Sequence, residues 1–448
     1  MNTKQLRQKI LDLAIRGKLV PQDPNDEPAS VLLERIKAEK EQLIKEGKIK
    51  RGKKSTSTSD KPHYPFEIPN GWCWVTLAEI SNYGCCTNVA IDDIPNDAWI
   101  LELEDLEKDS ARILQRLTKS ERQIKGVRHS FKKGNVLYSK LRTYLNKVLV
   151  ADKDGSCTTE IIPFSLYGGI CAKYISFVLR SKYFVDYAIQ CGYGVKMPRL
   201  STTDAHNGLI PLPPLKEQLR IVRAIEEYIC TIDMIDNDKV ELLSLSSNLK
   251  NKILQFAISG KLVPQDPADE PAEELLRRIN PSAVPADKSH YQHMPHGWSL
   301  TTMNFLCQLY DGERQEGERI NLDAKYLRGR SKGEMLNNGR FVPKYTTMIL
   351  VDGENSGEIF TAPIDGYQGS TFKLLNISTE MNVEYVKMII RIYQKRLRDN
   401  KVGSAIPHLN KKMFKAIEVP VPPLKEQARI VEKVSTLFSH IEALSECL

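Results

Sequence analysis

The most regular pattern of hydrophobic positions lies in the middle of the chain, at residues 215–259. This stretch follows two prolines, contains no glycine or proline, and stops at Gly260. Hydrophobic residues recur every three or four positions, the spacing that places them on one side of a helix. The pattern predicts one coiled-coil-like helix, about 65 Å long if it is continuous. A bend or a tight turn would fall at the polar residues 236–238.

Shorter periodic segments predict the elements on either side. Helical spacing predicts four further helices, at 1–16, 29–45, 170–190 and 383–399. Alternation predicts a strand at 135–139, and residues 347–351 fill the corresponding place in the second copy. These strands lie in two regions, 72–213 and 298–422, that both resemble mixed α/β domains with short strands.

The chain is internally duplicated. Three motifs occur twice: Pro-Pro-Leu-Lys-Glu-Gln at 213–218 and 422–427, Gly-Lys-Leu-Val-Pro-Gln-Asp-Pro at 17–24 and 260–267, and Pro-x-Gly-Trp at 69–72 and 295–298. The central helical stretch is one complete copy of a unit whose other copy is divided between the two ends of the chain. A repeat of this strength predicts a pseudo-twofold architecture in which the termini meet in a circular arrangement.

Composition narrows the class of protein. The 448 residues suit two to four units, and 27% charged against 41% hydrophobic residues is typical of a soluble protein. The sequence contains no export signal and no hydrophobic run long enough to cross a membrane. The nine cysteines follow no framework spacing, which favours reduced thiols. We therefore expect a cytoplasmic protein.

Charge is concentrated in two segments. Residues 108–150 hold twelve Lys or Arg against two acidic residues, and residues 387–412 hold eight against one. Either segment alone could be a solvated basic face. Because they occupy comparable positions in the two copies, we favour a nucleic-acid backbone as their partner. A third basic run, 37–54, precedes a Ser/Thr-rich stretch and resembles a solvated linker.

Signatures of catalysis are absent from the sequence. It contains no glycine-rich nucleotide-binding loop, no Gly-x-Ser-x-Gly elbow, and no Asn/Asp-Pro-Pro-aromatic run of the kind expected in a DNA amino-methyltransferase. The series His290, His293 and His296 does not recur as a whole in the first copy, so we do not expect zinc. Trp72 and Trp298 are interpreted as core anchors. No catalytic, cofactor-binding or metal-binding residue is predicted.

The repeated motifs resemble the specificity (S) subunit of type I restriction-modification systems. The resemblance covers essentially the whole chain. It depends on Pro-Leu-Pro-Pro-Leu-x-Glu-Gln-x-Arg-Ile-Val at 211–222 with its variant at 420–431, on the other duplicated motifs above, and on Tyr-Ser-Lys-Leu-Arg-x-Tyr-Leu at 138–145.

The resemblance implies an α+β fold: two mixed α/β target-recognition domains joined and separated by long antiparallel coiled-coil helices. It divides the chain into 1–60 (half-helix, turn and linker), 61–214 (first recognition domain), 215–286 (central helical spacer and linker), 287–423 (second recognition domain) and 424–448 (C-terminal helical region). Each recognition domain would read one half of a bipartite double-stranded DNA target. The helices would dock two modification (methyltransferase) subunits, and restriction subunits would complete the complex. S-adenosylmethionine, ATP and magnesium would belong to those partners, and the chain would be non-catalytic.

Candidate DNA contacts are basic or aromatic residues of the two domains. In the first domain they are Arg128, Lys132, Lys133, Tyr138, Lys140, Arg142, Lys147, Lys196 and Arg199. In the second they are Arg328, Arg330, Lys332, Lys344, Lys411 and Lys412. We expect most of them to touch phosphates. Three alternatives remain at this point: a stand-alone nuclease or methyltransferase, a pure assembly scaffold, and an RNA-binding protein, the last disfavoured because no aromatic ribonucleoprotein strand signature is present.

Overall fold

The long predicted helix is present as α7 (Leu215–Ile258), and it continues as a helix through the polar residues 236–238. The polar residues at this point have a partner on another helix. Asp233 and Asp236 both accept hydrogen bonds from the guanidinium of Arg7 in α1 (Thr3–Ile15), at 2.6 and 2.9 Å. The interruption of the hydrophobic stripe is therefore a site of helix pairing and not a break in the helix.

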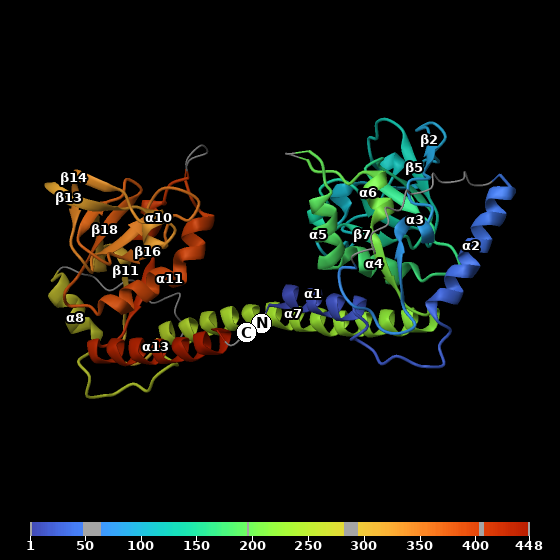
Figure 1. Cartoon of the computed structure of the whole chain (residues 1–448). Coiled ribbons are helices and arrows are strands. Elements are labelled where there is room, and N and C mark those ends of the chain that lie inside the picture. Colours follow the sequence, from blue (N-terminus) through green and yellow to red (C-terminus); the bar gives the residue numbers. More distant parts are fainter. Residues whose placement is uncertain (1, 48–63, 195–196, 282–293, 403–406, 447–448) are drawn as a thin grey trace. The chain divides into compact units, whose positions relative to one another are not determined.

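The structure is a computed structural model. It describes residues 2–47, 64–194, 197–281, 294–402 and 407–446. Two compact units are present, Met1–Asn237 and Asp238–Leu448 (Figure 1). Each combines helices with small sheets, which confirms the predicted α+β class.

The first unit contains a five-stranded sheet in the order β2-β5-β8-β3-β4, a three-stranded sheet β7-β6-β9, and the antiparallel pair β1-β10. Its strands are β1 (Cys73–Thr76), β2 (Thr87–Val89), β3 (Trp99–Leu101), β4 (Leu117–Thr118), β5 (Arg128–Phe131), β6 (Val136–Ser139), β7 (Val148–Val150), β8 (Gly155–Cys157), β9 (Ile161–Phe164) and β10 (Leu209–Leu212). Its helices besides α1 and α7 are α2 (Ala29–Lys45), α3 (Leu77–Ile80), α4 (Ala172–Arg180), α5 (Lys182–Gln190) and α6 (Thr202–Asn207).

The second unit contains a four-stranded sheet in the order β12-β18-β15-β16, a closed set β13-β14-β17, and the antiparallel pair β11-β19. Its strands are β11 (Ser299–Thr302), β12 (Cys307–Tyr310), β13 (Arg314–Leu322), β14 (Met335–Val342), β15 (Thr347–Leu350), β16 (Ile359–Thr361), β17 (Gly366–Gln368), β18 (Phe372–Ile377) and β19 (Glu418–Val421). Its helices are α8 (Ala272–Ile279), α9 (Met303–Leu306), α10 (Ala324–Leu327), α11 (Val383–Asp399), α12 (Lys411–Lys415) and α13 (Leu424–Glu446).

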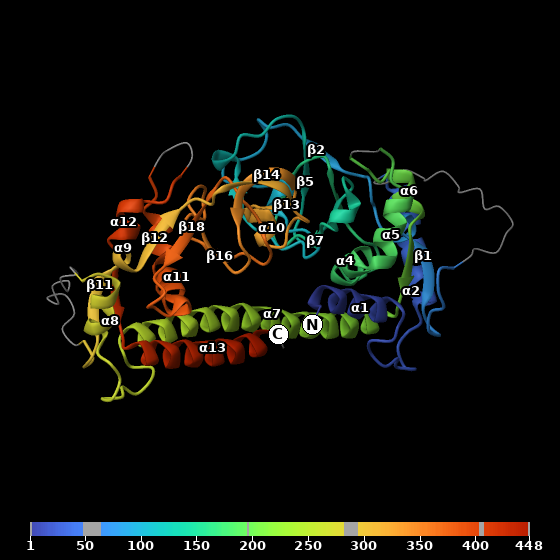
Figure 2. The ribbon, with the colours of Figure 1, turned by 90° about the vertical axis from the view of Figure 1, so that its left-hand side faces the viewer.

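Helix α7 has a different partner in each unit. In the first unit α1 lies along it, and in the second α13 lies along it, as both views show (Figures 1 and 2). Lys250 of α7 bonds Glu442 of α13 at 2.8 Å. Each unit therefore holds a pair of helices beside its sheets.

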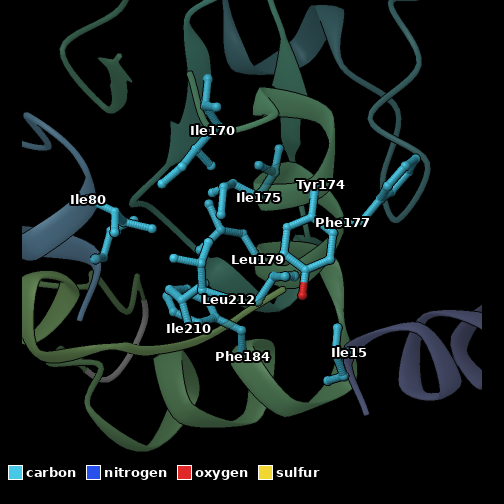
Figure 3. Packing of buried hydrophobic residues seen from close by; sticks show 14 of the residues in the cluster. Ile15, Ile80, Ile170, Tyr174, Ile175, Phe177, Leu179, Phe184, Ile210 and Leu212 are labelled. Carbon is cyan, nitrogen blue, oxygen red and sulfur yellow. The ribbon is translucent and has the colours of Figure 1, made fainter. Parts of the chain in front are cut away.

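The main core of the first unit forms where α4, β10 and α1 meet. Tyr174 and Leu212 are fully buried, and the Tyr174 hydroxyl donates to the carbonyl of Pro211 at 2.6 Å. Figure 3 shows Ile15 of α1 at the edge of this cluster, which joins the helix pair to the domain. The second unit repeats the arrangement: Tyr385 of α11 donates to the carbonyl of Pro420 at 2.7 Å.

The duplicated motifs meet in space at a buried contact that we call the tryptophan node. In the first unit the carboxylate of Glu217, 1% exposed, accepts from Nε1 of Trp72 at 3.0 Å and from Nε2 of Gln22 at 3.1 Å. In the second unit Glu426 accepts from Nε1 of Trp298 at 3.0 Å and from Nε2 of Gln265 at 3.1 Å. The three repeated motifs thus supply one residue each, and the two tryptophans lie in the core.

The glycine of each repeated turn is required by close packing. A Cβ atom on Gly17 would lie 2.2 Å from Pro69, and one on Gly260 would lie 2.2 Å from Pro295. Both glycines also have positive φ, at 66° and 67°. No other residue type meets both conditions without strain.

Candidate nucleic-acid interface

In the first unit, a hairpin that follows α5 is joined to the loop that follows β6. We call its residues 193–199 the first glycine hairpin; positions 195 and 196 lie outside the described residues. Four main-chain hydrogen bonds form what we call the hairpin frame: Tyr193 N to Arg199 O (3.0 Å), Arg199 N to Tyr193 O (2.9 Å), Arg142 N to Pro198 O (2.7 Å) and Leu200 N to Lys140 O (3.0 Å). The frame brings candidates Lys140, Arg142 and Arg199 together.

The second unit contains the same frame. The second glycine hairpin comprises residues 402–408, of which 403–406 are not described. Its hydrogen bonds are Val402 N to His408 O (3.0 Å), His408 N to Val402 O (2.8 Å), Gly353 N to Pro407 O (2.8 Å) and Leu409 N to Val351 O (2.7 Å). Because these bonds use only the main chain, they do not restrict the side chains that the hairpin presents.

The frame fixes which residues are equivalent. Lys140, Leu141 and Arg142 of the first unit correspond to Val351, Asp352 and Gly353 of the second. His408 occupies the position of Arg199, an equivalence that the shared Gly-x-x-x-Pro-x-Leu spacing could have revealed.

Arg142 has a strained main chain. Its φ and ψ are 50° and 59°, in the left-handed region, and the equivalent Gly353 also has positive φ, at 106°. A non-glycine residue in this region costs about 1–2 kcal/mol. The Nε of Arg142 is also buried, with no hydrogen-bond partner among the described residues. A strained main chain together with an unsatisfied buried nitrogen is typical of a residue kept for function.

Two candidates of the first unit are buried. Tyr138 is 4% exposed and packs against Tyr83 and Phe184, so its ring belongs to the core and does not present itself to DNA. Arg128 is 7% exposed and pairs with Glu102 at 2.7 Å. Because Tyr138 and Arg128 are buried, we do not propose them as DNA contacts.

The other candidates of the first unit lie at different places. Lys132 and Lys133 are exposed on the turn after β5, where Asp154 accepts from Nζ of Lys132 and from the amide of Lys133, each at 2.8 Å. Lys147 is half-buried, and its Nζ donates to the carbonyl of Leu103 at 2.6 Å; burial lowers its pKa. Lys196 lies outside the described residues.

The positive charge of the segment 108–150 is partly neutralised within the unit. Carboxylates just outside the segment hold several of its cations: Asp105 binds Arg122 at 2.5 Å, and Asp152 binds Arg116 at 2.5 Å. Residues 102–154 contain thirteen Lys or Arg and eight Asp or Glu, a net charge of +5, compared with +10 for the shorter segment. The net positive charge here is therefore smaller than the count over residues 108–150 indicates. We accordingly give most weight to the hairpin region as a place of DNA contact.

In the second unit, Arg330, Lys332, Lys344, Lys411 and Lys412 are exposed. Lys344 lies over the ring of Tyr345, 4.7 Å from its centroid, and that ring is itself 73% exposed. Arg328 is held by the carboxylate of Glu358, which leaves it half-buried.

Several further residues lie at these places without a sequence signal that marks them. Tyr193 is 58% exposed beside Arg199 in the first glycine hairpin. In the second unit a hollow of 260 Å³ lies against Asp352 and His408 and is also lined by Arg340 and Lys373. These residues come from segments far apart in the sequence, so only the structure brings them together.

The described residues contain no group of three or more His, Cys, Asp or Glu able to hold a metal ion. Of the histidines considered for zinc, His290 and His293 lie outside the described part. Among the helices that the structure describes, none is long and apolar enough to span a membrane. Every cysteine in the described ranges is a free thiol.

Comparison with known proteins agrees with this geometry. Residues 323–446 match the type I restriction modification DNA specificity domain. The type I restriction enzyme EcoAI specificity subunit of Escherichia coli is 27% identical over 97% of this chain and 89% of its own length. Over nearly its whole length the chain is similar to specificity subunits of type I restriction enzymes. The EcoEI specificity subunit of Escherichia coli is 33% identical over 63% of this chain and 55% of its own length.

Solved structures share the specificity-subunit fold. A chain from a structure of type I R-M complex assembly and conformational transition has a TM-score of 0.60 at 16% identity, covering 86% of this chain and 94% of that one. The HsdS subunit from Thermoanaerobacter tengcongensis has a TM-score of 0.51 at 16% identity, covering 86% and 93%. At these identities the likeness concerns the fold alone.

Proposed function

We propose that this chain selects the DNA sites on which a type I restriction-modification complex acts, and that each unit reads one half of a bipartite double-stranded target. The observation that carries the proposal is the pair of glycine hairpins, which have the same main-chain frame and different side chains. Two equivalent supports with unlike reading residues suit two unlike half-sites. As a specificity subunit, the chain recognises DNA and leaves the chemistry to its partners.

The proposed recognition domains are residues 61–214 and 287–423. Residues 215–286, 424–448 and 1–60 then supply the helical regions. Most of the remaining candidates would contact phosphates and position the domain on the duplex, while the hairpins would supply base contacts.

The proposed partners are two modification (methyltransferase) subunits and the restriction subunits, in the cytoplasm. S-adenosylmethionine, ATP and magnesium would be bound by these partners. Helix α7 offers a surface for docking: Leu242, Leu245 and Leu249 follow helical spacing and are 44%, 54% and 49% exposed. A stripe of exposed leucines is typical of a protein interface.

Leu245→Glu is expected to weaken association with the modification subunit by more than tenfold, because a buried leucine contributes about 1.5–3 kcal/mol and a buried carboxylate adds a penalty. Co-purification and sedimentation of the complex measure the effect. Ser247→Glu adds the same charge on the opposite side of the helix and should leave assembly intact. Equal assembly of both variants would remove this stripe from the interface.

The function is tested by expressing the chain with its cognate modification subunit and mapping methylated adenines across the host genome. We expect one motif divided into two unlike halves by a gap of constant length. Methylation without such a motif would mean that the partner chooses the site and that this chain is an assembly scaffold.

A further inference from the structure

The residues that face each glycine hairpin differ in chemistry between the two units. Within the hairpin frame, Leu141 forms an isolated antiparallel β-bridge with Arg199 in the first unit. Asp352 forms the equivalent β-bridge with His408 in the second. Since the surrounding main-chain hydrogen bonds are the same, these positions present their side chains from equivalent places. A difference in chemistry at an equivalent place is what two readers of different sequences require.

The carboxylate that pairs with the hairpin comes from a different position in each unit. In the first unit Glu160, which precedes β9, accepts from Nε and Nη2 of Arg199, both at 3.1 Å. In the second unit the residue that precedes β18 is Thr371, which carries no carboxylate. Asp352 supplies it instead, and its Oδ1 lies 2.6 Å from Nδ1 of His408. The second unit thus carries its carboxylate at position 352, the residue paired with the hairpin, and the first unit carries it at position 160.

The surroundings of Asp352 are basic. The hollow of 260 Å³ beside it is also lined by Arg340, Lys373 and Lys411. Arg340 bonds Asp311 at 2.9 Å, and Lys373 pairs with the same carboxylate, so two of the cations are held in place. The side chains of Asp352 and His408 remain 32% and 54% exposed, so the pair is accessible from the hollow.

We propose that Asp352 is a base-reading residue of the second unit and that its carboxylate accepts a hydrogen bond from the exocyclic amino group of a cytosine or adenine in the major groove. The inference rests on the proposed function. Phosphates repel carboxylates, so an acidic side chain favours DNA binding only when it meets a donor on a base. Lys411 offsets that repulsion together with Arg340 and Lys373, two cations that share the single carboxylate of Asp311, and His408 positions the carboxylate of Asp352.

The first unit lacks this acceptor. Leu141 cannot accept a hydrogen bond, and the carboxylate of Glu160 is engaged by two nitrogen atoms of Arg199. The two units therefore differ at this point of their half-sites, with an amino group read only by the second.

The test is Asp352→Asn in the full chain, co-expressed with the modification subunit and followed by mapping of methylated adenines. The amide keeps an acceptor for His408 but loses the charge and adds a donor. We expect discrimination to fall by about five- to 150-fold at one base pair of one half-site, with the other half-site unchanged. The base at that position identifies the amino group as that of cytosine or adenine.

Glu354→Gln is the matched control, because Glu354 is exposed two residues away and loses the same charge. It should preserve the wild-type motif. If the Asp352 variant fails to assemble, His408→Asn leaves the carboxylate in place without its positioning partner and should relax the same base pair. An unchanged motif in the assembled variants overturns the inference. A wild-type complex without any bipartite motif overturns the proposed function instead.

Discussion

Replacing Arg142 with glycine is expected to weaken DNA binding by about ten- to 100-fold and to leave the free energy of unfolding within about 1 kcal/mol of wild type. The guanidinium is lost, but the left-handed main chain, at φ 50°, becomes relaxed. The equivalent position already holds glycine, Gly353, in the same hairpin frame. DNA titration at constant salt and chemical denaturation of the full chain measure the two quantities.

Two further substitutions separate the side chain from the backbone. Arg142→Ala removes the guanidinium and keeps the strain, so it should bind DNA as weakly as the glycine variant and unfold more easily. Arg142→Lys keeps a charge and should recover part of the affinity. A glycine variant that binds with wild-type affinity would show that Arg142 has no role in DNA contact.

Glu217→Ala should destabilise the first unit by about 3 kcal/mol, and Glu426→Ala should do the same to the second. Each change leaves a buried indole N–H and a glutamine amide without their acceptor. Because the two carboxylates lie in different units, we expect each variant to lower a different unfolding transition, which hydrogen exchange followed by mass spectrometry can assign.

The control for this pair is Glu227→Ala, an exposed position on the same helix, which should change stability by less than about 0.5 kcal/mol. If Glu217→Ala is as mild as this control, the tryptophan node is not a major source of stability. The effect also depends on pH. Burial raises the pKa of Glu217 and Glu426 above 4.5, so their contribution is fully present below that value and declines as pH rises through the raised pKa. The difference between wild type and variant should therefore be larger at pH 4.5 than at pH 7.

Much of the fold could be predicted from the sequence because its signals are local. Helix α2 begins and ends at the predicted residues, and β6 and β15 lie within the predicted strands. The region 170–190 forms two helices, α4 and α5, because Ser181 caps the second one, accepting from the amide of Phe184. The continuity of α7 at 236–238 could not be predicted, since it involves Arg7, more than 220 residues away.

The candidate site was less predictable because it depends on contacts between distant segments. Counting basic residues along 108–150 omitted Asp105 and Asp152, which lie just outside the segment and neutralise part of it. The sequence pattern placed Tyr138 in a strand but could not tell that both faces of this strand are buried. The equivalence of Asp352 with Leu141 depends on main-chain hydrogen bonds between segments far apart in the sequence.

The hairpin frame has a consequence for how such a protein changes over time. A support made of main-chain N–H and C=O groups tolerates most side-chain substitutions. Residues 141, 199, 352 and 408 can therefore change one at a time while the protein stays folded. New target preferences then become accessible by single nucleotide changes at a few positions. The same property makes these four positions a compact library for directed evolution, in which most members should still fold.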